Sequence, residues 1–218
     1  MRLYGYWRSS ATWRVRIALA HKNIEYEYVA VNLRKDGGEQ NTPAFRAKNP
    51  MGRVPVLELE LDGETRTLSE SMAILELLEE RWPEPPLLPK DAFLRARARQ
   101  LAMLIVSGVQ PLQNTGVQIY IEDVLHLDAT PWIRHWVTSG LAAVETLVKE
   151  TAGAFAIGEA PTFVDACIVP QLFFARHFAI DLAACPTLVR IDDACAKLPA
   201  FEAAHASNMP DAERPQGT

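Results

Sequence analysis

The sequence predicts an α/β domain followed by an all-helical domain. Up to Trp82, short apolar stretches with strand periodicity alternate with helical patterns, whereas every apolar repeat after Lys90 has helical spacing. The segment between these two parts contains four prolines, and a helix cannot continue through it. We therefore expect a first domain at 1–82, a linker at 83–90 and a second domain at 91–218.

The predicted elements of the first domain follow the order βαβ and then ββα. The first half implies two parallel strands joined by a right-handed crossover through a helix. The second half contains a hairpin, because Asp62-Gly63 is a strong turn signal, and it ends in a helix with apolar residues at helical spacing. The expected ranges are strand 2–6, helix 12–22, strand 25–31, a polar loop 32–42, a short helical piece 43–48, strands 54–60 and 65–68, and helix 71–81.

The second domain is predicted to be a helical bundle. Thr162 and Asp165 precede an apolar stretch at the spacing of a capping box, so we assign them to folding rather than to chemistry. The expected helices are 91–107, 112–126, 131–150 and 162–178, with short pieces near 187–197 and 199–206. In helix 131–150 the repeat predicts one apolar face formed by Trp132, Trp136, Gly140, Val144 and Leu147.

The composition argues against several classes of function. The 218 residues are 49% hydrophobic with a formal net charge of −5, which suits a globular protein and offers no basic surface for nucleic acid. No apolar run is long enough to span a bilayer and no signal-peptide h-region follows Met1, so we expect a cytoplasmic protein without a membrane partner. Three cysteines without a C-x-x-C pair and five scattered histidines favour core-filling thiols and argue against a metal site.

Candidate chemistry begins at a turn where a short apolar strand meets a helix. Ser9 and Ser10 lie at the predicted helix entrance, where unpaired backbone N–H groups and the positive end of the helix dipole attract an anion. Arg8 borders the same turn. On the helix itself, we expect Arg16 to be a structural ion-pair partner and leave the role of Arg14 open.

Two later stretches add features of a ligand site. Pro55 stands at the mouth of a predicted central strand, where a proline forfeits a ladder hydrogen bond. Two explanations remain open: a cis Val54–Pro55 bond that turns the Val54 backbone towards a ligand, or an edge strand that starts with a trans proline. Glu70 and Ser71 open the next helix and would bind the ammonium and carboxylate of an amino-acid ligand, although each residue alone also suits plain capping.

Several motifs in this order resemble the cytosolic glutathione transferases. They are the W-R-S-S turn with its R-V-R-I-A-L helix, N-P-x-G-x-V-P, S-E-S-x-A-I-x-E-x-L, the proline-rich linker and the all-helical second half. Within that family, S-S-x-x-W-R-V-R at 9–16, Q-P-L-Q-N at 110–114 and V-P-Q at 169–171 are similar to the zeta class, which includes maleylacetoacetate and maleylpyruvate isomerases. The resemblance extends from Met1 to about Pro215.

The resemblance implies a thioredoxin-like first domain that binds glutathione, a helical domain that covers the second substrate, and a homodimer. It implies that Ser9 donates a hydrogen bond to the glutathione sulfur with support from Ser10, and that Arg176 binds a substrate carboxylate. Arg8 is a second candidate for a carboxylate because it borders Ser9. The implied glutathione ligands are Ser9, Ser10, Gln40, Val54, Glu70, Ser71, Gln110 and Asn114.

One departure from the family is Ala11, which stands where the family usually has a cysteine after the two serines. A thiol with a pKa of about 8.5 needs about 2.7 kcal/mol of preference for the thiolate to lower that pKa by about two units. A helix N-terminus supplies roughly 0.3–1 kcal/mol, or up to about 2 when partly buried, and a hydrogen bond to a charged group about 1.5–3. Ser9 and the helix end therefore suffice without a protein cysteine.

The expected function is glutathione-dependent isomerisation of maleylacetoacetate to fumarylacetoacetate in aromatic amino acid catabolism. Addition of the thiolate to the cis double bond, rotation and loss of the thiolate would give the trans isomer without net redox change. Three alternatives remain: a maleylpyruvate isomerase, a transferase or dehalogenase for small α-halo acids, and a non-catalytic glutathione-binding interaction module. The intact Ser9-Ser10 turn argues against the last of these.

Overall fold

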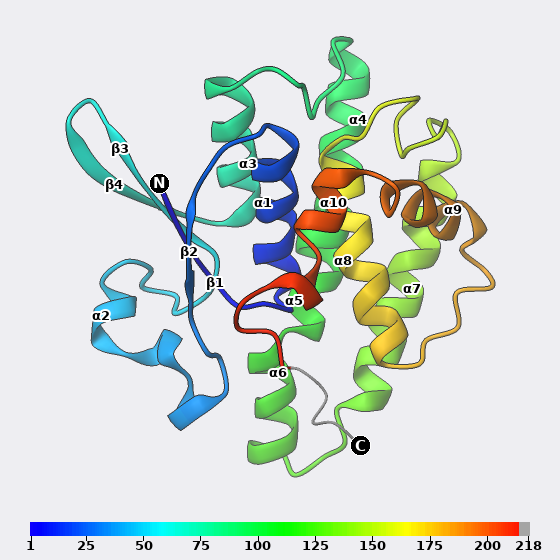
Figure 1. The fold of residues 1–218 in the computed structure, drawn as a ribbon. Coiled ribbons are helices and arrows are strands. Elements are labelled where there is room, and N and C mark those ends of the chain that lie inside the picture. Colours follow the sequence, from blue (N-terminus) through cyan, green and yellow to red (C-terminus); the bar gives the residue numbers. More distant parts are fainter. Residues whose placement is uncertain (214–218) are drawn as a thin grey trace. The chain divides into compact units, whose positions relative to one another are not determined.

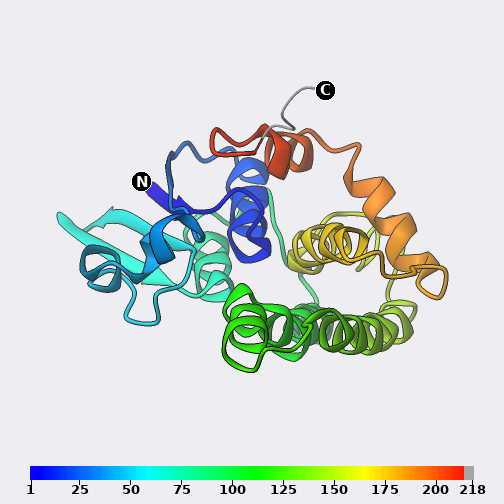
Figure 2. The ribbon, with the colours of Figure 1, turned by 90° about the horizontal axis from the view of Figure 1, so that it is seen from below.

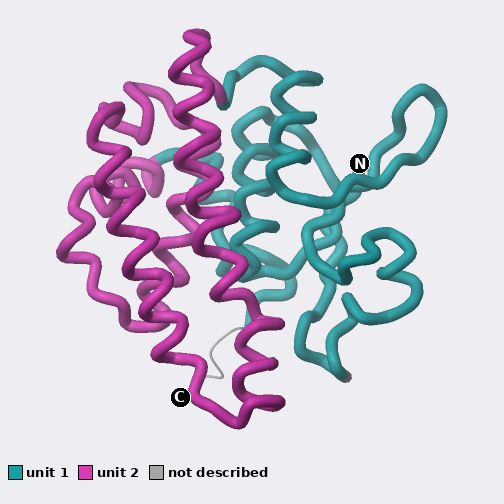
Figure 3. The backbone as a smooth tube through the Cα atoms, turned by 180° about the vertical axis from the view of Figure 1, so that it is seen from behind, with its two compact units in different colours: residues 1–87, 198–218 teal, residues 88–197 magenta. Residues whose placement is uncertain are grey.

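The computed structural model describes residues 1–213 and forms two compact units (Figure 3). The first unit combines residues 1–87 with the C-terminal segment that starts at Leu198, and the second comprises residues 88–197. This division differs from the expected one at the C-terminus, where the last part of the chain joins the first unit.

The first unit contains a four-stranded sheet with the strand order β2-β1-β3-β4. Neighbouring strands run parallel between β1 and β2 and antiparallel in the other two pairs, so the predicted βαβ and ββα arrangement is confirmed. The hairpin turns at Asp62 and Gly63, whose φ angles of 55° and 80° lie in the left-handed region that a tight hairpin needs. The strands are β1 (Arg2–Gly5), β2 (Glu27–Ala30), β3 (Val56–Leu61) and β4 (Glu64–Ser69).

One face of this sheet is covered by α1 (Ser10–His21) and α3 (Ser71–Arg81), which lie side by side (Figure 1). Leu3 of β1 and Leu57 of β3 are directly opposed in the register and fully buried. Because side chains alternate along a strand, their neighbours Tyr4 and Val56 point to the other face. The range predicted for α3 is the range observed.

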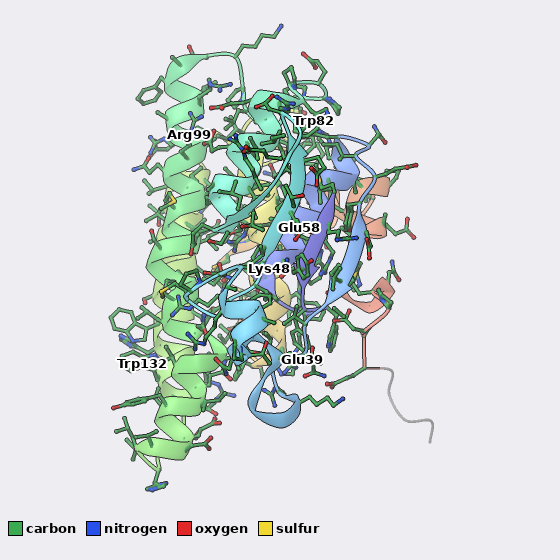
Figure 4. All side chains as sticks on the ribbon, turned by 90° about the vertical axis from the view of Figure 1, so that its left-hand side faces the viewer. Glu39, Lys48, Glu58, Trp82, Arg99 and Trp132 are labelled. Carbon is green, nitrogen blue, oxygen red and sulfur yellow. The ribbon has the colours of Figure 1, made fainter. Side chains whose placement is uncertain are left out.

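The other face of the sheet packs against α2 (Pro43–Arg46), whose Phe45 contacts Val56. Beyond α2, the Lys48 ammonium donates to the Glu58 carboxylate of β3 at 2.6 Å (Figure 4). This bond holds the pKa of Glu58 below its usual range, so both partners are charged at neutral pH. The 3₁₀ turns η1 (Lys35–Gly37) and η2 (Glu39–Asn41) lead into α2, so the loop before it is more ordered than the sequence indicates.

The C-terminal segment of the first unit packs on α1 (Figure 1, Figure 2). It contains α10 (Pro199–Ala203) and the 3₁₀ turn η5 (Ala206–Asn208). Every residue of α1 from Thr12 to Leu19 is buried, so this helix needs cover on more sides than the sheet and α3 provide. Helical periodicity reveals that the segment is helical but not which part of the chain it covers.

The second unit is all helical, as predicted. Two stretches that the sequence presents as ordinary helix are π-helical, a geometry that often occurs at functional sites. The elements are α4 (Ala92–Met103), η3 (Leu104–Val109, π), α5 (Gln110–Gln113), α6 (Thr115–Ile119), η4 (Tyr120–Val124, π), α7 (Thr130–Val148), α8 (Phe163–His177) and α9 (Pro186–Cys195).

The buried stripe of α7 is shifted by one position from the predicted apolar face, apart from Val144, which belongs to both. Trp132 is exposed and donates its indole N–H to the Leu112 carbonyl oxygen at 2.8 Å, so a polar ring atom holds it at the border of the core. Gly140 and Trp136 are only half-buried. The core stripe is formed instead by Ile133, Val137, Leu141, Val144 and Val148.

The capping box at the start of α8 is confirmed. Thr162 accepts a hydrogen bond from the Val164 N–H at 3.3 Å, and Asp165 accepts one from the Thr162 N–H at 2.7 Å. The three cysteines are free and buried, as expected for core-filling residues: Cys167, Cys185 and Cys195.

Candidate active site

Three loops of the first unit meet at one end of the sheet. The register pairs Tyr4 of β1 with Val56 of β3, and Val56 in turn with Ser69 of β4. The end of β1, the start of β3 and the end of β4 are therefore adjacent. The turn with Ser9, the residue Val54 and the pair Glu70-Ser71 project from these points.

Ser9 is the N-cap of α1. Its Oγ accepts a hydrogen bond from the Thr12 N–H at 3.3 Å, which leaves the hydroxyl proton of Ser9 available for donation. No acidic residue occupies the first turn of α1, so no side chain of that turn neutralises the positive helix end. Ser10 begins the helix and is buried. This geometry suits an anion that accepts from the Ser9 hydroxyl.

The N-terminus of α3 is tied to α1 by an arginine. Arg14 of α1 is fully buried, and its Nη1 donates to Ser71 Oγ at 2.9 Å. Its charge lies beside the first residue of α3, whose first turn also lacks acidic residues. The role of Arg14 that the sequence leaves open is thus a link between the two helix ends where anions bind best.

Glu70 has an uncommon backbone conformation for a residue other than glycine. Its φ is 68°. Its side chain is exposed and makes no capping hydrogen bond to α3. Plain capping is therefore excluded for Glu70, and its carboxylate is free to bind a ligand cation. The neighbouring Val54–Pro55 bond is cis and β3 is an inner strand of the sheet, which excludes an edge strand that starts with a trans proline.

Gln40 lies beside this group of residues through its backbone. A side chain at Gly52 would come within 3.0 Å of the Gln40 carbonyl oxygen, so the η2 turn abuts the segment that leads to Val54. The Gln40 Nε2 donates to the Leu33 carbonyl oxygen at 3.3 Å, whereas its Oε1 is buried without a hydrogen-bond partner among residues 1–213. A buried acceptor of this kind is normally satisfied by a hydrogen-bond donor, for which an ordered water or a ligand N–H is suitable.

Arg8 is half-buried and its Cζ lies 5.8 Å from the centre of the Trp7 ring. Arg16 is structural, as expected, but among residues 1–213 its guanidinium donates to backbone carbonyl oxygens and forms no ion pair with a carboxylate. It donates to the oxygens of Trp7 at 2.8 Å and Ala204 at 3.2 Å. Burial lowers the pKa of Arg16, yet such a guanidinium remains charged at neutral pH.

The other predicted site residues, Gln110, Asn114 and Arg176, belong to the second unit. Gln110 begins α5 directly after the π-helical η3. Asn114 caps α6 by accepting from the Gly116 N–H at 2.8 Å. Arg176, near the end of α8, is exposed and pairs with the Asp192 carboxylate at 2.6 Å. The structure thus gathers six of the predicted residues in the first unit: Ser9, Ser10, Gln40, Val54, Glu70 and Ser71.

The sequence pattern does not single out one buried polar pair in the second unit. Gln113 and Gln171 are buried and exchange two amide hydrogen bonds, at 2.8 and 3.1 Å, which join α5 to α8. Such a pair fixes the helix that carries Gln110. The only signal in the sequence is that both glutamines lie within the Q-P-L-Q-N and V-P-Q motifs.

Comparison with known proteins identifies the family. The glutathione S-transferase N-terminal domain model matches residues 8–81. "Probable maleylacetoacetate isomerase 2" of Drosophila melanogaster is 46% identical over 209 residues, covering 96% of this chain and 89% of the relative. A solved structure of maleyl pyruvate isomerase, described as a bacterial zeta-class glutathione S-transferase, is 38% identical to this chain and has a TM-score of 0.91. The match covers 98% of this chain and 100% of the solved one. The chain belongs to the zeta-class glutathione transferase family.

A second solved structure has a higher sequence identity to this chain. The crystal structure of maleylacetoacetate isomerase from Anaeromyxobacter dehalogenans 2CP-1, with glutathione in its active site, has 52% identity and a TM-score of 0.89, covering 97% of each chain. Within residues 1–213 of the zeta-class chain, no helix is long and apolar enough to cross a membrane. In the same range, no cluster of three or more His, Cys, Asp or Glu side chains is placed to hold a metal ion.

Proposed function

We propose that this protein is a glutathione-dependent isomerase that converts maleylacetoacetate to fumarylacetoacetate. The observation that carries the proposal is the arrangement at one end of the sheet. There, the Ser9 hydroxyl at the start of α1 retains a proton to donate, and Arg14 ties this helix to the start of α3. Relatives that cover almost the whole chain are named maleylacetoacetate isomerase, which supports the choice of reaction.

The residues present fit a bound tripeptide. The buried Oε1 of Gln40 offers an acceptor for a peptide N–H, and the backbone of Val54 lies at the mouth of β3. Ser71 and the N-terminus of α3 would hold the carboxylate of the γ-glutamyl group, while Glu70 would hold its ammonium. Gln110 and Asn114 are the ligands that we assign to the helical unit.

Bound glutathione supplies a thiolate that adds to the cis double bond and leaves after rotation. Ser9 donates a hydrogen bond at the sulfur, with Ser10 in support, and the N-terminus of α1 favours the negative charge. Arg8 binds a carboxylate of the substrate, and Arg176 is assigned to the other carboxylate. These two cations matter because the protein as a whole carries a net charge of −5 and would repel a dicarboxylate.

We also propose a cytoplasmic homodimer that acts in the catabolism of tyrosine and phenylalanine. The family resemblance supports the dimer, and the expected substrate supports the pathway. Sedimentation equilibrium of the purified protein tests the dimer, because a mass of one 24.3 kDa chain would contradict it.

The assay that tests the reaction follows isomerisation of maleylacetoacetate with and without glutathione. We expect turnover only with glutathione, and none with S-methylglutathione, which lacks the thiol. Turnover without glutathione, or none under any condition, would contradict the proposal.

A second candidate activity is the isomerisation of maleylpyruvate, because a maleyl pyruvate isomerase of 38% identity has the same fold over 98% of this chain. The TM-score does not separate the two activities, since it is 0.91 both for this structure and for a maleylacetoacetate isomerase. Comparison of kcat/KM for the two substrates under the same conditions separates the candidates. The larger value identifies the substrate for which the pocket is built.

A further inference from the structure

The turn that carries Ser9 is held in place by side chains from elsewhere in the first unit. Trp7 stands two residues before Ser9. Its N–H donates to Asp211 Oδ2 at 3.0 Å, and its carbonyl oxygen accepts from Arg16 Nη2 at 2.8 Å. Because β1 ends at Gly5, the sheet ladder does not reach Trp7, and these two bonds fix both of its backbone polar groups.

Asp211 belongs to the C-terminal segment, which is attached to the rest of the unit at several points. The Ala204 carbonyl oxygen accepts from Arg16 Nε at 3.2 Å, and the His205 ring meets the Trp13 ring edge-on at 4.9 Å. The Tyr28 hydroxyl donates to Asp211 Oδ2 at 3.3 Å. Burial raises the pKa of Tyr28, so its hydroxyl is a donor at neutral pH.

We propose that Asp211 is a positioning residue for the glutathione thiolate, acting through the backbone of Trp7. The Asp211 oxygen that accepts from the Trp7 N–H fixes the turn from which the Ser9 hydroxyl and the first N–H groups of α1 project. A small displacement of these donors weakens their bonds to a sulfur anion much more than it weakens the grip on the remote γ-glutamyl end. The inference rests on the proposed glutathione site at Ser9.

The test is a titration of the glutathione thiol in its complex with the protein. The ultraviolet absorbance of the thiolate reports its apparent pKa. Affinity for S-methylglutathione, which has no titratable thiol, reports binding of the rest of the peptide. The variants are Asp211→Ala, Asp211→Asn and Asp211→Glu, with Glu213→Ala as the control that removes an exposed carboxylate of the same segment.

We expect Asp211→Ala to raise the thiol pKa by about one unit, which corresponds to about tenfold less thiolate relative to thiol. Affinity for S-methylglutathione should change less than threefold. Asp211→Asn keeps an acceptor for the Trp7 N–H and should restore most of the thiol pKa. Asp211→Glu keeps the charge but displaces the acceptor by one methylene, so it should behave like the alanine variant.

Two results would overturn the inference. One is a thiol pKa that stays at the wild-type value in Asp211→Ala while only the unfolding temperature falls. The other is a wild-type pKa in Asp211→Glu together with a raised pKa in Asp211→Asn, because charge rather than position would then be decisive. If Asp211→Ala does not fold, the Asn and Glu variants alone make this distinction.

The proposed function can fail independently of this inference. Absence of isomerase turnover in the wild-type protein would contradict the function, whereas the thiol titration uses glutathione alone. Conversely, normal turnover with identical thiol pKa values in all variants would contradict the positioning role alone.

Discussion

A single hydroxyl at Ser9 has two tasks. It accepts the Thr12 N–H at the start of α1, and in the proposed complex it donates its proton to the sulfur. The sequence motif locates this residue because strand, turn and helix signals follow each other within a few positions. It does not locate the role of Arg14, because the partner Ser71 lies 57 residues further along the chain.

Replacement of Ser9 separates catalysis from capping. Ser9→Ala should lower kcat/KM roughly 10- to 100-fold, since a hydrogen bond to a charged group contributes about 1.5–3 kcal/mol. The lost cap should lower stability by about 0.5–2 kcal/mol. Steady-state kinetics and denaturant unfolding measure the two effects, and Ser10→Ala is the control. A larger kinetic loss in Ser10→Ala would reverse the assigned roles.

Arg176 has a partner that competes with a substrate. Its guanidinium pairs with Asp192 at 2.6 Å, so the substrate carboxylate must replace or share this partner. Arg176→Ala should raise KM for the dicarboxylate, and Asp192→Asn should lower it. The dissociation constant of glutathione should stay nearly constant in both variants, as measured by calorimetry. Equal losses of glutathione affinity and substrate affinity would refute the assigned role.

At the scale of elements, buried polar contacts join α1 to α3 near both ends of the pair. Arg14 and Ser71 form the first contact near the helix N-termini. The second is at the other end, where Lys22 Nζ donates to Glu79 at 2.8 Å and to the carbonyl oxygens of Trp82 and Pro85. The relative placement of the two proposed anion sites therefore depends on both contacts.

The Lys22–Glu79 contact allows a stability test. Lys22→Met should destabilise the fold by roughly 3–5 kcal/mol, because it leaves the Glu79 carboxylate buried without its cation. The double variant with Glu79→Gln removes that charge and keeps an acceptor for the Leu87 N–H, so it should recover at least half of the loss. Urea unfolding measures both. Equal stability of the single and double variants would show that the buried charge is not the cause.

The cap of α8 predicts a dependence on pH. Burial raises the pKa of Asp165 to about 6 from 3.8, so between these values the folded state binds more protons than the unfolded state. The contribution of Asp165 to the free energy of unfolding therefore decreases as the pH rises through this window, by about 3 kcal/mol. The stability advantage of wild type over Asp165→Asn should shrink from pH 4 to pH 6. An advantage that grows over this range would contradict the raised pKa.

The periodicity of the sequence predicts the order and type of the helices and strands. It is less accurate for the buried faces of helices and for the residues at which elements begin and end. The predicted helix 71–81 coincides with α3, because Ile74, Leu75 and Leu78 have no polar group that competes with burial. In α7, the predicted apolar face includes the large aromatic residues Trp132 and Trp136. The residues that are buried in the structure are instead the aliphatic ones, one position further along the helix. The π-helical turns leave no clear signal in the apolar pattern.

At the scale of the whole molecule, the return of the chain to its first unit is the feature that the sequence did not reveal. The helical pattern continues past Leu198, and the boundary expected from the proline-rich linker assigned everything after it to one domain. Which unit the last segment covers depends on contacts such as Arg16 with Ala204, between residues 188 positions apart.

A truncated chain tests this assignment. A protein that ends at Lys197 loses the cover of Trp13 and the Ala204 acceptor of Arg16, both within the first unit. Limited proteolysis with mass spectrometry should therefore find early cleavage in residues 1–87, while residues 88–197 resist longer. The full-length protein is the control. Early cleavage confined to residues 88–197 would contradict the assignment.

All three cysteines belong to the second unit, and the first unit has none, since Ala11 occupies the position after the two serines. A mixed disulfide between glutathione and the protein therefore cannot form at the Ser9 turn. Oxidation of the cellular glutathione pool would deprive the enzyme of its reduced ligand without modifying this turn. Restoring reduced glutathione should then restore activity at once, with no enzyme-catalysed removal of a bound thiol.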